Sequence, residues 1–180
     1  EEKLHELCKL TEQTIDVSVD GDGQLVLTGS AGSDDIEVVG SVPVTVLGSD
    51  GDDTIIGSDG NDALSGQAGD DYIRGGAGDD TITGGEDDDI LVGGEGDDTL
   101  AGNAGDDVLT GGEGVDVAVF SGAQSDYTFA SSVDGLTVTV TEKSTGDFDT
   151  ISGVETLRFD DGVTIDVSVD GDGQLVLTGS

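Results

Sequence analysis

Hydrophobic and polar positions recur with a period of nine residues between Gly48 and Val119. This segment divides into eight nonapeptides, which read GSDGDDTII, GSDGNDALS, GQAGDDYIR, GGAGDDTIT, GGEDDDILV, GGEGDDTLA, GNAGDDVLT and GGEGVDVAV. Position 8 is a large aliphatic residue in seven units and Ala118 in the eighth, and most units have a polar residue beside it. The alternation over positions 7 to 9 predicts one short β-strand per unit, with position 8 pointing inward.

Glycine and aspartate hold the other fixed positions. Position 1 is glycine throughout: Gly48, Gly57, Gly66, Gly75, Gly84, Gly93, Gly102 and Gly111. Position 2 is Ser49, Ser58, Gln67, Gly76, Gly85, Gly94, Asn103 and Gly112. Position 4 is Gly51, Gly60, Gly69, Gly78, Asp87, Gly96, Gly105 and Gly114. Position 6 is aspartate throughout: Asp53, Asp62, Asp71, Asp80, Asp89, Asp98, Asp107 and Asp116. Glycines permit tight turning at positive φ, so positions 1 to 6 are predicted to form a turn.

The flanking segments differ from this array. Residues 29–37, GSAGSDDIE, are an isolated unit of the same frame with Asp34 at position 6, and the frame then breaks around Pro43. Residues 120–163 hold five of the six aromatic residues and alternating apolar residues, which predicts a small antiparallel β cap. The predicted division is a short amphipathic helix at 1–13, a degenerate first part of the roll at 14–47, the roll at 48–119 and the cap at 120–163. Ala118 and Val115 indicate that the roll ends near residue 119.

A longer repeat is superimposed on the nonapeptides. The segment TIDVSVDGDGQLVLTGS at 14–30 returns letter for letter at 164–180, an offset that is not a multiple of nine. Residues 164–180 are therefore predicted to begin a second copy of the 14–163 module. Alternatively, they are an assembly element that takes, in a neighbouring molecule, the place of 14–30.

Composition narrows the possible partners. Asp and Glu total 41 against five Lys and Arg, a net charge of −36 that lacks the basic footprint which nucleic acid or an anionic membrane requires. No apolar run is long enough for membrane insertion, and residues 1–13 do not resemble a signal peptide. Cys8 has no second cysteine to pair with inside the chain. His5, the only histidine, is interpreted as a surface residue.

Stacked carboxylates raise an energetic problem that a cation solves. When units i and i+2 stack at the strand spacing, the position 6 aspartates form two columns in which each adjacent pair repels by about 3 kcal/mol. Burying one Ile or Leu per unit returns only about 1.5–3 kcal/mol, and ordering each backbone residue costs about 1–2 kcal/mol. The metal-free chain is therefore predicted to be an expanded coil. Two carboxylates and several backbone carbonyls make an all-oxygen shell, which suits Ca²⁺ better than Mg²⁺, zinc or copper.

The predicted ligands are Asp34, the position 6 aspartates and the residues at positions 1, 2 and 4 of the nonapeptides, and six same-side pairs of units imply about six or more Ca²⁺ ions. Binding and folding would then be one event.

Residues 48–119 resemble the Ca²⁺-binding nonapeptide G-G-x-G-x-D-x-U-x of RTX (repeat-in-toxin) proteins. Residues 114–162 resemble a segment that follows such repeats in large secreted bacterial proteins. The resemblance implies a parallel β-roll with Ca²⁺ in its turns and export by a type I secretion apparatus. Asp87 departs from the turn glycine, and four polar residues replace the second glycine.

Three functions fit these features. The first is a non-catalytic, calcium-rigidified module of an extracellular or cell-surface protein, such as an adhesin, a surface layer or a filament subunit that assembles head-to-tail. The second is an accessory domain for secretion or folding of a secreted enzyme, such as a metalloprotease or a polysaccharide-modifying enzyme. Catalysis within these residues is not expected, because the carboxylates keep the strict phase of metal ligands. Carbohydrate binding ranks lowest, since the outer face offers only Tyr72 as an aromatic platform.

Overall fold

The computed structural model describes residues 15–21, 24–132, 136–170 and 175–179. The helix predicted for residues 1–13 lies outside them, and none of their helices is long and apolar enough to cross a membrane. The elements are β1 (Asp16–Val19), β2 (Leu25–Thr28), β3 (Asp35–Glu37), β4 (Val44–Asp50), β5 (Thr54–Ile56), β6 (Ala63–Ala68), β7 (Tyr72–Ala77), β8 (Thr81–Glu86), β9 (Ile90–Glu95), β10 (Thr99–Ala104), β11 (Val108–Glu113), β12 (Val117–Phe120), the 3₁₀ turn η1 (Gln124–Asp126), β13 (Tyr127–Ser131), β14 (Val138–Glu142), β15 (Phe148–Ser152), β16 (Thr156–Phe159), β17 (Thr164–Val169) and β18 (Leu175–Gly179).

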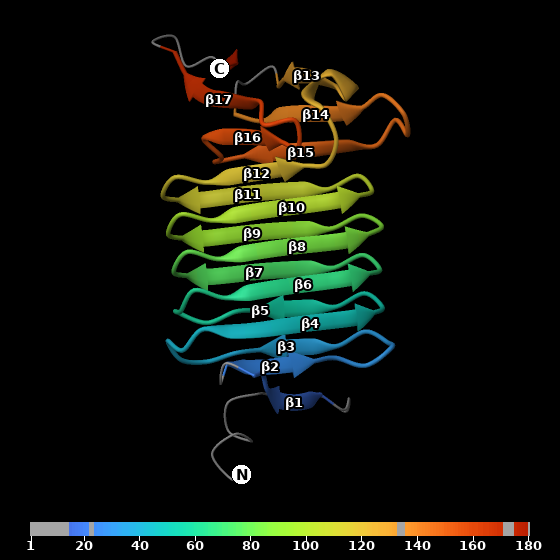
Figure 1. Cartoon of the computed structure of the whole chain (residues 1–180), viewed down its shortest axis with the longest axis vertical. Helices are drawn as coiled ribbons and strands as arrows, with labels where there is room; N and C mark the ends of the chain where they lie inside the picture. The colour runs from blue at the N-terminus through green and yellow to red at the C-terminus, as the bar shows by residue number, and fades with distance from the viewer. Residues whose placement is uncertain (1–14, 22–23, 133–135, 171–174, 180) are drawn as a thin grey trace.

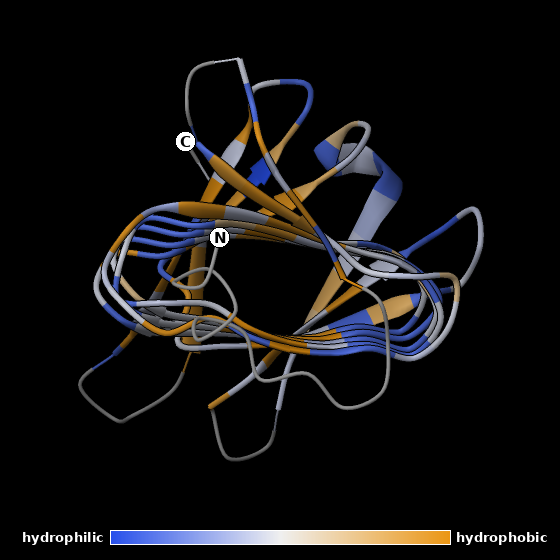
Figure 2. Cartoon of the chain, turned by 90° about the horizontal axis from the view of Figure 1, so that it is seen from below, coloured by the Kyte–Doolittle hydropathy of each residue, from blue (hydrophilic) through white to orange (hydrophobic). Residues whose placement is uncertain are grey.

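Successive nonapeptides alternate between two sheets, so the chain winds as a spiral (Figure 1). One sheet has the order β1-β2-β4-β6-β8-β10-β12-β16-β17-β18, and the other has β13-β14-β15-β11-β9-β7-β5-β3. Strands β6, β8 and β10 pair in parallel, with Leu64 opposite Ile82 and Ile82 opposite Leu100. Seen along the long axis, the coils superimpose as a flattened ring of two layers (Figure 2). The predicted parallel β-roll is confirmed.

The strands are longer than the sequence predicted. Strand β8 covers positions 7 to 9 of one unit and continues through positions 1 to 3 of the next, as most roll strands do. Identical units stacked in register keep their backbones at pairing distance beyond position 9, as in the pair Gln67 and Gly85. The turn is therefore confined to about three residues.

Positions 6, 8 and 1 face the interior, because they are every second residue along the strand and the residue before it; position 1 is glycine and contributes no side chain. Every position 8 residue is at most 2% exposed: Ile55, Leu64, Ile73, Ile82, Leu91, Leu100, Leu109 and Ala118. Ile36 and Val46 are also buried and continue the apolar core towards the N-terminal end of the roll. Each nonapeptide contributes one apolar side chain to the core, at position 8. The buried position 6 aspartates therefore line the two edges of the core, next to the turns.

The cap contains the predicted antiparallel strands, since β13, β14 and β15 pair antiparallel in sequence order. Phe120, Tyr127 and Phe159 pack together with ring centroids 5.4–5.5 Å apart, and the Tyr127 hydroxyl donates to the Ser121 carbonyl. However, the roll does not end near residue 119. Strand β15 pairs in parallel with β11, and β16 pairs in parallel with β12, so residues 148–159 form a further coil.

The two copies of the 17-residue repeat are β-hairpins with one register in different surroundings. Val17 lies opposite Leu27 in the first copy, and Val167 lies opposite Leu177 in the second. In the first copy the second strand, β2, pairs with β4 of the roll. In the second copy the first strand, β17, pairs with β16 of the cap. The hairpins thus stand at opposite ends of the ten-stranded sheet.

Candidate metal centre

The position 6 aspartates link each turn to the turn stacked on it. Oδ1 of Asp89 accepts a hydrogen bond of 2.9 Å from the backbone N–H of Asp71, 18 residues earlier. The same bond runs from Asp34 through Asp53, Asp71 and Asp89 to Asp107 on one side, and from Asp62 through Asp80 and Asp98 to Asp116 on the other. Two columns of buried carboxylates therefore run along the two borders of the roll.

The second carboxylate oxygen has no partner in seven of these residues. Oδ2 is buried and makes no hydrogen bond in Asp53, Asp71, Asp80, Asp89, Asp98, Asp107 and Asp116. A buried carboxylate oxygen without a partner is costly, so each of these atoms indicates a missing ligand.

Position 1 glycines make room for this oxygen. A Cβ on Gly84 would collide with Oδ2 of Asp89, and the other position 1 glycines face the same contact with their own aspartates. A Cβ on Gly93 would also lie 2.6 Å from the carbonyl oxygen of Gly111, in the next turn of the stack. The unpartnered carboxylate oxygen and a backbone carbonyl thus border one small space between stacked turns.

Burial changes the acidity of these carboxyl groups. It raises the pKa of Asp80 and of Asp89 to about 7, and the pKa of Asp53 and of Asp98 to about 6. Hydrogen bonds from backbone N–H groups oppose this rise in pKa, and neighbouring aspartates reinforce it. With pKa values of about 7, Asp80 and Asp89 retain part of their protons near neutral pH, and a cation bound to their oxygens would displace these protons.

Two turns have a different conformation. In the turn Gly57–Asp62, the Ser58 N–H donates to Oδ2 of Asp62 over 2.6 Å, and in the isolated upstream unit the Ser30 N–H donates to Oδ2 of Asp34 over 2.5 Å. The turn at 57–62 stacks on the irregular segment around Pro43, where a Cβ on Gly60 would lie 3.0 Å from the Pro43 nitrogen. Because no regular turn lies beneath this one, the Ser58 N–H points towards the Asp62 carboxylate and takes up its Oδ2 atom.

The other polar residues at position 2 adopt the positive φ angles of the glycines that they replace. Ser49, Gln67 and Asn103 have φ values of 95°, 88° and 81°, within the left-handed region that glycine favours. Asp87 likewise has φ 76° at position 4, so the fifth unit keeps the shape of its neighbours despite lacking a glycine there. Ser58 is the exception among the position 2 residues, since its φ is not positive.

Position 5 has a structural role that sequence reasoning missed. Oδ1 of Asp70 accepts from the N–H of Asp88, and Oδ1 of Asp88 accepts from the N–H of Asp106, at 3.2 and 2.8 Å. A parallel ladder runs through Asn61, Asp79 and Asp97 on the other side. The paired D-D at positions 5 and 6 was the available signal: the inner aspartate faces the core, and the outer one ties the exposed turns together.

The cap extends both columns, which the sequence analysis also missed. Oδ1 of Asp149 accepts from the N–H of Asp107 at 3.1 Å, and Oε2 of Glu155 accepts from the N–H of Asp116 at 2.8 Å. Burial, reinforced by the Asp107 carboxylate, raises the pKa of Asp149 to about 8. The signal was DTISG at 149–153, which matches DTITG at 80–84 except for one residue.

The donor set consists of oxygen atoms. Among the described residues, no three His, Cys, Asp or Glu side chains converge on one point, so carboxylates alone do not form a cage. Each space between stacked turns offers an unpartnered carboxylate oxygen and a neighbouring carbonyl, which are hard ligands that suit Ca²⁺. The residues therefore fit the cation that the sequence implied.

A parallel β-roll with carboxylates and glycine carbonyls in stacked turns defines a class of calcium-binding repeat proteins. The family described as "RTX calcium-binding nonapeptide repeat (4 copies)" matches residues 47–82 and 83–118. This part of the chain is an RTX repeat array.

No curated protein matches the chain significantly. Among solved structures, the extracellular lipase LipA from Serratia marcescens is similar at 21% identity and a TM-score of 0.38, over 78% of this chain and 17% of the lipase. The chain thus spans about a sixth of the length of that lipase.

Proposed function

We propose that the stacked turns bind Ca²⁺ and that this binding drives the folding of the roll. The observation that carries the proposal is the set of seven buried Oδ2 atoms without a hydrogen-bond partner. The ligands of each ion would be the position 6 aspartates of two stacked turns, together with backbone carbonyls of positions 1, 2 and 4. The turn of Asp62 would not hold an ion of this kind, because its Oδ2 already accepts the Ser58 N–H.

The charge balance supports coupling between binding and folding. The chain carries a net charge of −36, and the metal-free roll buries a carboxylate in every turn. Bound cations neutralise both columns at once, whereas the unfolded chain offers no preformed site. We therefore expect a cooperative transition, with midpoints of about 10⁻⁴–10⁻³ M, the range typical of extracellular calcium modules.

Such an affinity favours a protein that stays unfolded inside the cell and folds outside it. The proposed role is a structural module of a secreted or cell-surface bacterial protein, exported by a type I apparatus. An accessory folding or secretion domain of a secreted enzyme is the alternative. The two proposed roles differ in what the full-length protein would contain, since only the accessory role requires a catalytic domain attached to the module.

The duplicated hairpin supports a role in joining modules. Leu27 on β2 is 4% exposed because β4 covers it, while its counterpart Leu177 on β18 is only partly buried. Conversely, Ile165 on β17 is 6% exposed beneath the cap, while its counterpart Ile15 is only partly buried. The first copy therefore buries its second strand, β2, and the second copy buries its first strand, β17. A hairpin with both contacts would connect the cap of one module to the roll of the next in one continuous sheet, a heterologous contact that propagates.

Calcium binding is tested by far-UV circular dichroism and light scattering during a Ca²⁺ titration from EGTA upward, with a parallel Mg²⁺ titration. We expect a cooperative transition from coil to β-structure with Ca²⁺ and none with Mg²⁺. A chain that is already β-structured in EGTA at pH 8 would contradict the coupling.

The joint is tested with two truncated chains in Ca²⁺. Removal of residues 1–30 opens the edge of β4, so the β17–β18 hairpin of another molecule can pair there, and we expect polymers by sedimentation velocity. Removal of both 1–30 and 164–180 leaves no hairpin and should give monomers. A folded, monomeric chain lacking only 1–30 would disprove the joint.

A further inference from the structure

The coil formed by β15 and β16 repeats the geometry of the roll without a nonapeptide sequence. Ile151 lies opposite Leu109 and is 2% exposed, and Leu157 lies opposite Ala118 and is fully buried. These residues occupy the place of position 8. Ser152 pairs with a position 9 residue and Thr156 with a position 7 residue, so only Gly153, Val154 and Glu155 join them, where a nonapeptide has the six residues of positions 1 to 6.

Asp149 occupies the place of a position 6 aspartate. Its Oδ1 accepts the Asp107 N–H just as Asp107 Oδ1 accepts the Asp89 N–H, at 3.1 and 2.9 Å. The outer ladder continues as well, because Phe148 donates its N–H to Oδ1 of Asp106 at 2.9 Å. Asp149 is only 9% exposed, so its carboxylate lies within the column and not on its surface.

The second column ends in a similar way at the opposite border. Glu155 reaches the Asp116 N–H with one carboxylate oxygen, although the rest of its side chain is exposed. A Cβ on Gly111 would collide with the carbonyl oxygen of Gly153, where a Cβ on Gly93 would meet that of Gly111. The cap therefore places a carboxylate and a carbonyl over the last nonapeptide turn.

Below this coil, Asp107 and Asp116 have buried Oδ2 atoms without partners, at 1% and 0% residue exposure. They are the two unpartnered aspartates whose stacked neighbour is not a nonapeptide. Their carboxylates have the same need for a cation as those inside the roll, but the next turn of the stack belongs to the cap.

We propose that the cap completes two Ca²⁺ sites of the roll, with Asp149 as a ligand above the turn Gly102–Asp107 and with Glu155 and the Gly153 carbonyl above the turn Gly111–Asp116. Of the seven sites that the unpartnered oxygens indicate, five lie between nonapeptide turns and these two are shared with the cap. Calcium thereby fastens the cap to the roll. This inference rests on the proposed calcium binding.

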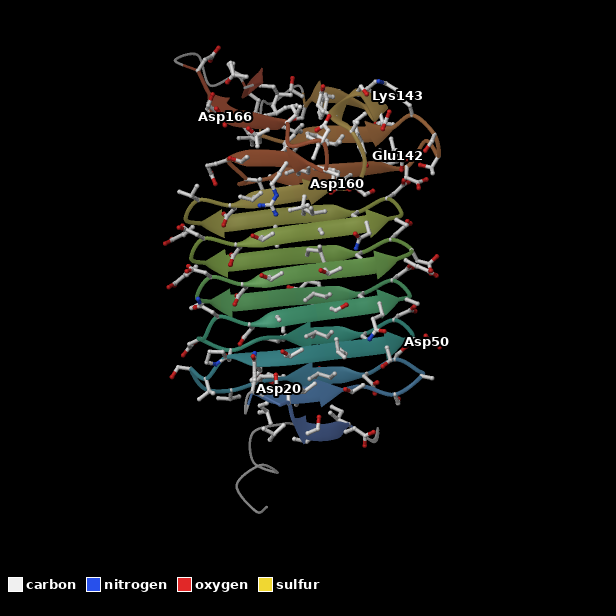
Figure 3. The ribbon with its side chains drawn as sticks, viewed as in Figure 1. Asp20, Asp50, Glu142, Lys143, Asp160 and Asp166 are labelled. Atoms are coloured by element: carbon white, nitrogen blue, oxygen red, sulfur yellow. The ribbon has the colours of Figure 1, made fainter. Side chains whose placement is uncertain are left out.

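The test compares calcium binding by the full chain with that of Asp149→Asn, Asp149→Glu, Glu155→Gln and Asp166→Asn. Asparagine keeps the acceptor for the Asp107 N–H and removes only the charge, whereas glutamate keeps the charge. Asp166 is exposed on β17, opposite Thr156 and therefore close to Glu155, but it belongs to neither column, so it serves as the matched control for loss of one negative charge at this end of the roll (Figure 3). Isothermal titration calorimetry counts the ions, and circular dichroism at saturating Ca²⁺ checks the fold.

We expect Asp149→Asn and Glu155→Gln each to bind one ion fewer than the unsubstituted chain, or to bind one ion at least tenfold more weakly. Asp149→Glu should retain most of the binding, and Asp166→Asn should match the unsubstituted chain. If the unsubstituted chain binds Ca²⁺ and Asp149→Asn binds it equally well, the cap is not a ligand. Equal losses in Asp149→Asn and Asp149→Glu would assign the effect to packing and would also overturn the proposal. A chain that binds no Ca²⁺ at all would instead refute the proposed function.

Discussion

The backbone N–H of Asp80 donates a hydrogen bond of 2.8 Å to Oδ1 of Asp98, 18 residues later, while Oδ2 of Asp98 has no partner. One side chain thus serves two purposes in this roll. Its first oxygen holds stacked turns in register, and its second is left for a cation. The two purposes are separable by substitution because an amide preserves the acceptor without the charge.

The charge of a mid-column aspartate is predicted to control calcium affinity. Asp89→Asn keeps the acceptor for the Asp71 N–H but weakens the oxygen shell, so the Ca²⁺ midpoint for folding should rise severalfold with little change in the calcium-saturated β-structure. Asp89→Ala also leaves a buried N–H unpaired and should cost a further 1–3 kcal/mol, roughly, in the free energy of unfolding. Calcium titrations followed by circular dichroism, with denaturant unfolding in saturating Ca²⁺, measure both effects.

Glu86→Gln is the matched control, since Glu86 is exposed at position 3 and lies outside both columns. A midpoint shift in Glu86→Gln as large as that in Asp89→Asn would show that total charge, and not the column, sets the affinity.

Asp87 is predicted to destabilise the roll. A non-glycine residue at φ 76° pays a steric cost of up to about 1–2 kcal/mol, and less for aspartate than for most residues. Asp87→Gly should therefore increase the free energy of unfolding in Ca²⁺ by about 0.5–1 kcal/mol, as measured by denaturant titration. Glu86→Gly, at the adjacent strand position without positive φ, should decrease it by a similar amount. If both variants shift stability in the same direction, backbone strain at residue 87 is not the cause.

A methyl group at position 1 is predicted to be poorly tolerated. In Gly84→Ala the new Cβ meets Oδ2 of Asp89, so either the carboxylate or the turn must move, and overpacking of this kind typically costs about 1–3 kcal/mol. The Ca²⁺ midpoint should rise at the same time because the displaced oxygen is a proposed ligand. Gly32→Ala is the control, since nothing lies within 4 Å of its Cβ position. Equal behaviour of the two alanine variants would argue against this close approach.

Acid is predicted to favour the metal-free fold. The pKa of Asp80 and of Asp89 is about 7 in the folded chain, against 3.8 for an ordinary aspartate, so between pH 4 and 7 the folded state binds more protons than the unfolded state. The resulting penalty is complete above pH 7 and is relieved as the pH falls. In EGTA, β-structure should therefore increase between pH 8 and pH 5, as followed by circular dichroism. β-Structure that decreases over this range in EGTA would contradict the prediction.

The nine-residue period is sufficient to predict the roll. Because three residue types keep separate positions through eight units, the alternating sheets, the inward position 8 and the two columns of aspartates follow from period and stereochemistry alone, whereas the length of the strands depends on in-register stacking. The antiparallel strands of the cap followed from alternation in the same way.

The segments that lie on either side of a turn are known only from the folded chain. Ser58 differs from Ser49, although both follow a position 1 glycine, because the segment around Pro43 replaces the turn on which Ser58 would stack. Asp149 joins the column of Asp107, although the two residues are 42 positions apart in the sequence. The two identical hairpins use opposite strands to contact the rest of the fold. These relationships depend on contacts between segments distant in the chain. Local preference does not encode them, since burial and pairing are decided by the neighbour that the folded chain supplies.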